Sequence, residues 1–313
     1  MKHLISIYDL SAEQINNIFN LSKTLKSQQK EGLEHHHLKG KTLGMIFTKS
    51  STRTRISFEA GMYQLGGSAL FLSSSDIHLG RGETIKDTAK VLSRYLDGIM
   101  IRTYKHSDVE ELAKHADIPV INGLTDLMHP CQALADIFTM IEVKGSLKGR
   151  KLAYIGDGNN VANSLIHICT KLGIDISIAT PKGYECNSMV IHESFKEANI
   201  SGSKVTITQS VQEAVSNSDV VYTDTWVSMG QEDEKEERIQ IFSPYKVTKD
   251  VMSMAKPDAV FMHCLPAYRE YEVSEEVIDG PQSVVLDQAE NRLHVQKAVM
   301  TLLINPQPLP CFQ

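Results

Sequence analysis

The sequence has few cysteines, no long apolar run and no excess of basic residues. Its five cysteines include no Cys-x-x-Cys pair, which argues against a disulfide framework and favours a reducing cytoplasm. No apolar stretch approaches the ~20 residues that a membrane helix needs, and the first residues lack the features of a signal or transit peptide. A formal net charge of −6 argues against a general nucleic-acid binder, which needs a strong basic field. We therefore expect a cytoplasmic protein that binds neither nucleic acid nor membrane.

What is present is a globular composition and a repeated alternation of strands and helices. The 313 residues are 42 % apolar and 22 % charged, which suits two domains that each bury a core. Strands are predicted at residues 42–47, 69–72, 98–102, 118–122, 152–156, 174–179, 205–207, 220–222 and 259–262. Helices are predicted between them, including 56–65, 90–95, 132–143, 161–172 and 289–303. This alternation predicts parallel sheets covered on both faces.

A polar hinge at residues 145–149 divides the two runs of strands. We expect an α/β fold with two doubly wound parallel-sheet domains and the active site between them. The first domain would cover residues 1–148 and the second residues 149–288, while the C-terminal helix, 289–313, would pack back on the first. Ligands of such sheets bind at the carboxyl ends of the strands, near a switch in strand order.

Three adjacent histidines, at residues 35–37, lie in a predicted polar loop. On a regular element three consecutive side chains cannot all face one metal ion. A solvated loop is therefore the favoured interpretation.

The first candidate site lies between the first predicted strand and the helix after it. Residues 49–55 contain two arginines and four hydroxyl side chains. A helix N-terminus offers unpaired N–H groups and the positive end of a dipole, while arginine adds a charged fork that matches an oxyanion. The segment therefore predicts a phosphate site, although it would also suit a capped helix with solvated arginines.

Six motifs, in order along nearly the whole chain, resemble those of the aspartate and ornithine carbamoyltransferases. They are Ser-Thr-Arg-Thr-Arg at 51–55, Arg102 at a strand end, His-Pro-Cys-Gln at 129–132, the Asp-x-x-x-Ser-Met-Gly loop at 224–230, His-Cys-Leu-Pro at 263–266 and Ala-Glu-Asn-Arg at 289–292. The Ser-Met-Gly and His-Cys-Leu-Pro motifs resemble the ornithine enzymes. The resemblance implies transfer of a carbamoyl group from carbamoyl phosphate to the side-chain amine of ornithine, giving citrulline and phosphate.

The resemblance also implies which residues bind carbamoyl phosphate: Ser51, Thr52, Arg53, Thr54, His78, Arg102, His129, Gln132, Cys264, Leu265 and Arg292. Arg53 would offset charge on the departing phosphate. Arg102 and His129 would lie near the carbamoyl oxygen, where each donor to a developing oxyanion is worth ~3 kcal/mol. Gln132 and the backbone at 264–265 would bind the carbamoyl NH₂, and His78 would reach a neighbouring subunit's site.

For ornithine, the resemblance implies a site formed by Asn160, Asp224, Ser228 and the backbone of Met229. The ornithine amine is protonated at neutral pH, as a lysine amine would be (pKa ~10.4), so it must lose a proton before attack. A Cys264 thiolate near Asp224 would help to take that proton. The alternative is that Cys264 is a small apolar residue whose backbone matters more than its sulfur.

Three other functions are weighed against this one. Gly156-x-Gly158 after a strand superficially fits a dinucleotide-dependent oxidoreductase, but Val161 occupies the third glycine position and no ribose-binding acid follows the next strand. A binding protein that has lost catalysis is disfavoured because every catalytic motif position is filled. A carbamoyltransferase with another acceptor, such as putrescine or a modified ornithine, is disfavoured by the Ser-Met-Gly motif.

One segment departs from the family pattern. Where the family often continues His-Arg-Gly after the His-Cys-Leu-Pro motif, this chain has Tyr268-Arg269-Glu270. The resemblance implies a homotrimer or a higher assembly of trimers, with no metal or organic cofactor. Arginine biosynthesis is favoured over ornithine-producing catabolism, and the sequence leaves the direction open.

Overall fold

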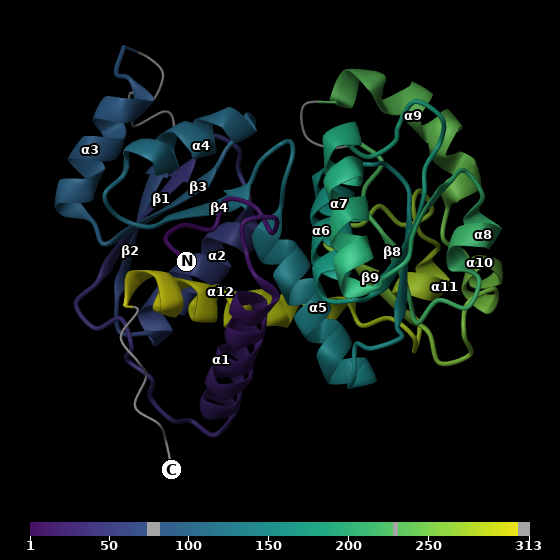
Figure 1. Cartoon of the computed structure of the whole chain (residues 1–313), viewed down its shortest axis with the longest axis horizontal. Coiled ribbons are helices and arrows are strands. Elements are labelled where there is room, and N and C mark those ends of the chain that lie inside the picture. The colour runs from purple at the N-terminus through teal and green to yellow at the C-terminus, as the bar shows by residue number, and fades with distance from the viewer. Residues whose placement is uncertain (74–81, 228–230, 306–313) are drawn as a thin grey trace. The chain divides into compact units, whose positions relative to one another are not determined.

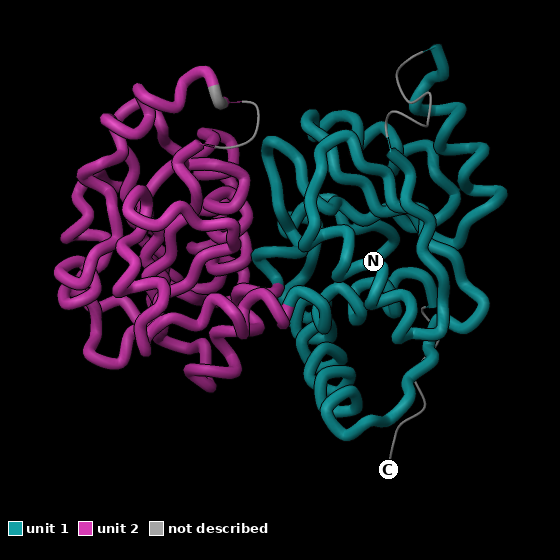
Figure 2. Tube along the Cα trace, turned by 180° about the vertical axis from the view of Figure 1, so that it is seen from behind, with its two compact units in different colours: residues 1–134, 292–313 teal, residues 135–291 magenta. Residues whose placement is uncertain are grey.

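The computed structural model describes residues 1–73, 82–227 and 231–305. The chain forms two compact units (Figure 2), of which unit 1 comprises Met1–Leu134 with Arg292–Gln313 and unit 2 comprises Ala135–Asn291. Both boundaries fall inside helices, namely α5, Pro130–Lys144, and α12, Val285–Ile304. By this division residues 145–149 lie within unit 2.

Unit 1 is built on a four-stranded parallel sheet with the order β2-β1-β3-β4 (Figure 1). Its strands are β1 Thr42–Phe47, β2 Ser68–Ser73, β3 Gly98–Arg102 and β4 Val120–Leu124. Its helices are α1 Ala12–Lys30, α2 Thr52–Gln64, α3 Ile85–Tyr95 and α4 His106–His115, together with parts of α5 and α12. The first strand along the chain, β1, lies inside the sheet, with β2 on one side and β3 on the other.

Unit 2 is built on a five-stranded parallel sheet with the order β7-β6-β5-β8-β9. Its strands are β5 Lys151–Ile155, β6 Asp175–Ala179, β7 Val205–Thr208, β8 Val220–Thr223 and β9 Val260–His263. Its helices are α6 Asn160–Lys171, α7 Ser188–Ser201, α8 Val211–Val215, α9 Lys235–Phe242, α10 Lys249–Ser253 and α11 Glu275–Ile278, with 3-10 turns η1 Glu232–Glu234 and η2 Ser243–Tyr245. The prediction of two doubly wound parallel-sheet α/β domains is confirmed.

Each sheet has a switch point that singles out two strand ends. In unit 1 the switch point lies between β1 and β3, because β2 and β3 lie on opposite sides of β1. In unit 2 it lies between β5 and β8, because β6 and β8 lie on opposite sides of β5. The segments after these strands are where a doubly wound sheet binds its ligands. They contain residues 48–54, Arg102, residues 156–160 and Asp224.

Each unit has its own hydrophobic core. In unit 1 a cluster of buried residues that includes Ile46, Ile99 and Leu112 packs the sheet against α3 and α4. In unit 2 the corresponding cluster includes Ile155, Val221 and Phe261. Burial of this apolar surface is the main term that stabilises each unit.

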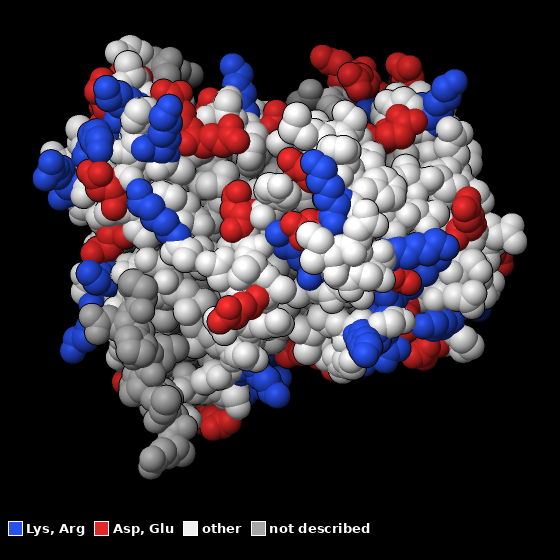
Figure 3. Space-filling model, viewed as in Figure 1, with Lys and Arg blue, Asp and Glu red and all other residues white. Residues whose placement is uncertain are grey.

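The surface and the described helices agree with the composition. Basic and acidic side chains are interspersed on the face drawn in Figure 3. Among the described residues, no helix combines the length and the apolar character that crossing a membrane requires.

The main local correction concerns the start of α2. The sequence predicts a helix over 56–65, whereas α2 begins at Thr52 and is capped by Ser51, whose extended backbone lies just outside the helix. The hydroxyl and arginine residues of the phosphate motif therefore form the cap and first turn of a helix rather than a loop. A helix that starts with polar residues shows no apolar periodicity there, which is why the predicted start lies one turn after the observed one.

Candidate active site

The phosphate motif forms a capped helix start directly after β1. Ser51 Oγ accepts the Thr54 backbone N–H at 3.3 Å and donates to Thr54 Oγ1 at 3.1 Å. The other end of the preceding loop is fixed by Thr48, whose N–H donates to the Arg102 carbonyl at 3.0 Å. The turn after β1 is thereby joined to the end of β3, at the switch point of the unit 1 sheet.

Two buried arginines converge on one hydroxyl group in this turn. Arg292 Nη2 on α12 donates to Thr54 Oγ1 at 3.0 Å, and Arg102 Nη1 at the end of β3 lies 3.5 Å from the same oxygen. Thr54 is fully buried, and the two arginines are 6 % and 4 % exposed. Because Thr54 is neutral, these contacts orient the guanidinium groups without cancelling their charge.

Helix α5 contributes two more of the predicted residues. Gln132 Oε1 accepts from Arg292 Nη1 at 3.1 Å, and His129 immediately precedes the helix, where its carbonyl accepts the Gln132 N–H. Burial lowers the pKa of His129 well below its usual value, and the positive charges of Arg292, Arg102 and Lys49 lower it further. The imidazole is therefore neutral at pH 7 and lies in a positive field.

The two arginines of the phosphate motif have different surroundings. Arg53 lies half-buried in the first turn of α2, beside the exposed Thr52. Arg55 Nε forms an ion pair with Glu59 at 2.9 Å, and its guanidinium lies 3.9 Å from the centre of the Phe71 ring. Arg55 thus belongs to the outer side of α2. His78 lies outside the described residues.

Unit 2 holds a second cluster at the carboxyl ends of β5, β8 and β9. Asp224 is 5 % exposed; its Oδ2 accepts from Asn159 Nδ2 at 2.8 Å, and its Oδ1 lies 2.9 Å from Cys264 Sγ. Asn159 also caps α6 through Oδ1, which accepts the N–H groups of Val161 and Ala162. Its neighbour Asn160 starts the helix, partly exposed. Ser228 and Met229 lie outside the described residues.

A buried pair that the sequence did not single out shapes the backbone around Cys264. His263 Nδ1 accepts the Leu265 N–H at 2.9 Å, and His263 Nε2 lies 3.3 Å from Glu272 Oε1. Leu265 has φ of +58° and precedes a cis peptide bond to Pro266. Since a left-handed backbone is unfavourable for leucine, the contact from His263 helps to hold this conformation and the carbonyl directions around it.

These contacts also argue against a metal ion in the cluster. Ligand atoms of Asp224, His263 and Cys264 lie within 4.8 Å of one another. However, both ring nitrogens of His263 already have partners, Leu265 and Glu272. We therefore interpret this network as two neighbouring hydrogen-bonded pairs, Asp224 with Cys264 and His263 with Glu272.

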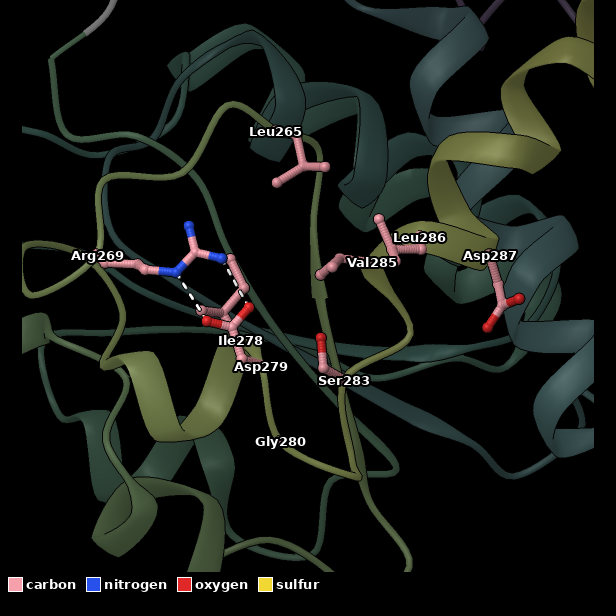
Figure 4. A pocket seen from close by; sticks show the side chains of 9 residues that line it. All are labelled: Leu265, Arg269, Ile278, Asp279, Gly280, Ser283, Val285, Leu286 and Asp287. Carbon is pink, nitrogen blue, oxygen red and sulfur yellow. Dashed lines mark hydrogen bonds and ion pairs between the residues drawn. The ribbon is translucent and has the colours of Figure 1, made fainter.

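Beside this network lies a pocket of about 720 Å³, shown in Figure 4. Leu265 lies at one end of it and the first residues of α12 line one side (Figure 4). Arg269 and Asp279 form a two-point ion pair, with distances of 2.8 and 2.6 Å. Arg269 keeps the family's arginine, whereas Tyr268, which departs from the pattern, donates its backbone N–H to Glu272 Oε1 at 2.6 Å and so contacts the His263–Glu272 pair.

The predicted residues thus form two groups. In unit 1, Thr54 contacts Ser51, Arg102 and Arg292, and Arg292 also contacts Gln132. In unit 2, Cys264 contacts Asp224, as the resemblance implied, and lies next to Leu265. The implied binding of carbamoyl phosphate by Cys264 and Leu265 stays a prediction. Asn159 and Glu272 were missed: Asn159 carried an N-cap signal, whereas nothing local marks Glu272.

Comparisons with known proteins match this arrangement. Residues 2–142 match the family described as "Aspartate/ornithine carbamoyltransferase, carbamoyl-P binding domain", and residues 148–303 match its "Asp/Orn binding domain". The chain is 59 % identical to the ornithine carbamoyltransferase of Bacillus subtilis, over 97 % of this chain and 94 % of the relative. It is 56 % identical to one from Pyrococcus furiosus named "Ornithine carbamoyltransferase, anabolic", over 97 % and 96 %. A solved structure of ornithine carbamoyltransferase from P. furiosus superposes with a TM-score of 0.95, at 56 % identity and covering 97 % of each chain.

Proposed function

This chain belongs to the aspartate/ornithine carbamoyltransferase family, and from that premise we propose that it is an ornithine carbamoyltransferase. It transfers the carbamoyl group of carbamoyl phosphate to the side-chain amine of L-ornithine, and the products are L-citrulline and phosphate. The nitrogen lone pair forms the new N–C bond as the C–O bond to phosphate breaks.

The observation that carries the proposal is the convergence of Arg102 and Arg292 on Thr54 at a helix start. Two buried guanidinium groups, a capped helix N-terminus and a hydroxyl cluster are a combination suited to a dianionic phosphate. A carboxylate at the position of Thr54 would neutralise the arginines. A neutral hydroxyl leaves their charge available to the ligand.

The same residues suit the charge changes of the reaction. Arg53, in the first turn of α2, binds the phosphate oxygens with Ser51 and Thr52 and offsets the charge that grows as phosphate leaves. Arg102 and neutral His129 donate to the carbamoyl oxygen as it becomes negative during attack. Preorganised donors of this kind are each worth ~3 kcal/mol in the transition state. Gln132, held by Arg292, binds the carbamoyl NH₂.

Ornithine binds to the cluster in unit 2. The Asp224 carboxylate, oriented by Asn159, pairs with the α-ammonium, and Asn160 donates to the α-carboxylate. Ser228 and the Met229 backbone complete this site, as in the family motif. The buried polar groups of this site pair with the α-ammonium and the α-carboxylate of ornithine. An amine without these two groups would leave the protein's polar groups unpaired and is therefore rejected.

Cys264, as a thiolate, receives the proton that ornithine must lose and becomes a thiol. In the thiol form its S–H donates to Asp224 Oδ1, which lies 2.9 Å from the sulfur. The backbone of 264–265, fixed by His263, contacts the carbamoyl NH₂. A Cys264→Ala variant separates these roles, because it removes the sulfur and keeps the backbone.

The chain acts in the cytoplasm in the biosynthetic direction and as a homotrimer. Support for the direction is the 56 % identity to a relative named anabolic. Support for assembly is the exposed edge of the unit 1 sheet, where Leu70 and Phe71 on β2 are 48 % and 38 % exposed. His78 follows β2 by five residues in the sequence, which suits a role in a neighbouring subunit's site.

An acceptor panel with a matched pair of arginine variants tests the proposal. Purified chain is incubated with carbamoyl phosphate and L-ornithine, putrescine, L-aspartate or N-acetylornithine, and ureido product and phosphate are measured. Ornithine is expected to be the preferred acceptor.

Arg53→Ala should lower kcat/KM by at least about 100-fold, the scale of losing a donor to developing charge. Arg55→Ala removes an arginine two residues away that pairs with Glu59, and it should retain most activity. Equal activity of the two variants, or preference for another acceptor, would contradict the proposal.

A further inference from the structure

A lysine ammonium is buried in unit 1, outside the groups assigned to substrate. Lys297 lies on α12 and has no exposed surface. Its Nζ lies 2.8 Å from Gln29 Oε1, 2.9 Å from Gln64 Oε1 and 3.0 Å from His35 Nε2. An ammonium group has three N–H donors, and each therefore has a neutral acceptor, on α1, on α2 and in the loop between α1 and β1.

His35 belongs to the run of three histidines for which the sequence predicted a solvated loop. That prediction is wrong for His35, which is only 6 % exposed. Its Nδ1 lies 3.0 Å from the Leu33 carbonyl, and a carbonyl can only accept, so Nδ1 carries the proton and Nε2 accepts from Lys297. Burial and the Lys297 charge lower the pKa of His35, which keeps this tautomer neutral.

Burying an ammonium group among neutral acceptors is unfavourable, because the charge loses its hydration. Burial lowers the pKa of Lys297 to about 8, and an apolar side chain of the same length would avoid that cost. Directional hydrogen bonds to three elements instead fix one arrangement among similar packings. The Lys297 cluster is therefore better suited to fixing the relative positions of these elements than to stabilising the fold.

The helices α2 and α12 are joined at two places by polar contacts. At one, Arg292 contacts Thr54 in the first turn of α2; at the other, Lys297 contacts Gln64 in its last turn. Between them the helices approach closely, because a Cβ added at Gly61 would lie 2.9 Å from Met300 Cε and 3.3 Å from Lys297 Cγ. A shift of α12 along α2 would therefore move Arg292 away from Thr54.

We propose that Lys297 is a positioning residue for the phosphate site: by binding Gln64 it fixes α12 against α2 and so holds Arg292 at Thr54. The proposal rests on the function proposed above. It assigns a role to contacts at the far end of α2, ten residues from Thr54. The contact with Gln29 belongs to α1, which carries no proposed substrate residue, and serves as an internal comparison.

The test changes one acceptor at a time and leaves the lysine in place. Gln64→Met removes the acceptor on α2, and Gln29→Met removes the equivalent acceptor on α1. Gln64→Met should raise the KM for carbamoyl phosphate about tenfold, the effect of losing one hydrogen bond to a charged group, without changing the KM for ornithine. Gln29→Met should leave both KM values within about twofold, because it removes the contact to α1 and leaves in place the Lys297–Gln64 contact that joins α12 to α2. Gln64→Glu keeps an acceptor and should restore the wild-type KM.

Each outcome has a defined meaning. Equal increases in KM for Gln64→Met and Gln29→Met would show that the cluster only stabilises unit 1, and would overturn the proposal. So would equal increases for carbamoyl phosphate and ornithine. If the wild-type chain forms no citrulline, the proposed function fails instead, and the affinity of the same variants for inorganic phosphate, measured by calorimetry, then decides whether Gln64 positions Arg292. Lys297→Met removes all three contacts of the ammonium group at once, and circular dichroism checks that this variant is folded.

Discussion

Thr54 illustrates how a neutral residue can organise a site for a charged ligand. Its single oxygen contacts a serine hydroxyl and two guanidinium groups. With an acidic residue in place of Thr54, the two arginines would form ion pairs with its carboxylate, and the positive potential at the site would be lower. Because Thr54 is neutral and fully buried, it restricts the arginine side chains while their charge still lowers the pKa of His129.

A Thr54→Val variant tests this role, because valine has the same shape and lacks the hydroxyl. We expect the KM for carbamoyl phosphate to rise about tenfold, since the arginines lose their common acceptor, a loss worth ~1.5 kcal/mol. The KM for ornithine should be unchanged. Steady-state kinetics provide the measurement. Thr24→Val, on the exposed face of α1, removes a hydroxyl that donates to the Asn20 carbonyl at 3.1 Å, and is the matched control.

The role of a single residue can be predicted from the sequence when the residues that act with it are close to it in the chain. The arginines, His129 and Cys264 stand in short motifs, so their positions could be read directly. The partners of Lys297 lie on α1, α2 and the loop at His35, more than 230 residues earlier in the case of Gln64. No local pattern in the sequence indicates such a contact, and the triple histidine was therefore assigned to solvent.

At the scale of elements, α9 anchors the segment that carries Asp224. Arg238 on α9 is 3 % exposed; it donates through Nε to the Trp226 carbonyl at 2.6 Å and through Nη2 to Asp157. Its guanidinium lies 4.9 Å from the centre of the Tyr184 ring. Asp157 follows β5, and Trp226 follows β8. Arg238 thus links the two segments at the unit 2 switch point.

This link should make ornithine binding sensitive to pH. Burial raises the pKa of Asp157 to about 6, against the opposing effect of Arg238. Above that pH the carboxylate is ionised and pairs with Arg238, and as the pH falls through 6 it is protonated and the ion pair is lost. We expect the KM for ornithine to rise about fivefold between pH 7 and pH 5, a change of ~1 kcal/mol.

In Asp157→Asn, which cannot ionise, the KM for ornithine should already be raised at pH 7 and should change little down to pH 5. Asp219→Asn, the control, removes a buried carboxylate that pairs with Arg150 beside the opposite end of β5, and should keep the wild-type pH profile. Identical profiles for the wild type and Asp157→Asn would show that Asp157 does not control this site.

Among the elements, strands were predicted more accurately than helices. The ranges predicted for 42–47 and 98–102 coincide with β1 and β3, because buried parallel strands appear as short, continuous apolar runs. Helices with a polar cap begin earlier than predicted, as with α2 after Ser51 and with α3, which follows the cap Thr84 and begins at Ile85 rather than residue 90. Helix α12 also begins earlier than predicted, at Val285 rather than Ala289. The short helices α8, α10 and α11 are not predicted from the sequence, because four or five residues carry too few apolar positions for a helical period to be visible.

At the scale of the whole molecule, unit 1 exposes an apolar sheet edge. Strand β2 is the last strand of its sheet, and its burial pattern is mostly exposed or intermediate. Helix α2, which packs on β2, also carries an exposed apolar side chain, Ile56, at 57 %. An uncovered edge strand of this kind is a template for association with another chain, which supports the proposed trimer.

A Leu70→Asp variant should therefore dissociate the assembly. Wild-type chain is expected at about 105 kDa in light scattering after gel filtration, three times the chain mass of 34.9 kDa, and the variant near the mass of one chain, because a charge at an apolar interface is left without a partner. Activity should fall with the mass, since the proposed site includes His78 from a neighbouring subunit. Ile200→Asp makes the same change on α7 in unit 2, where Ile200 is 83 % exposed, and should keep mass and activity. A Leu70→Asp variant that remains trimeric would place the interface elsewhere, and one that is monomeric and fully active would show that each chain carries a complete site.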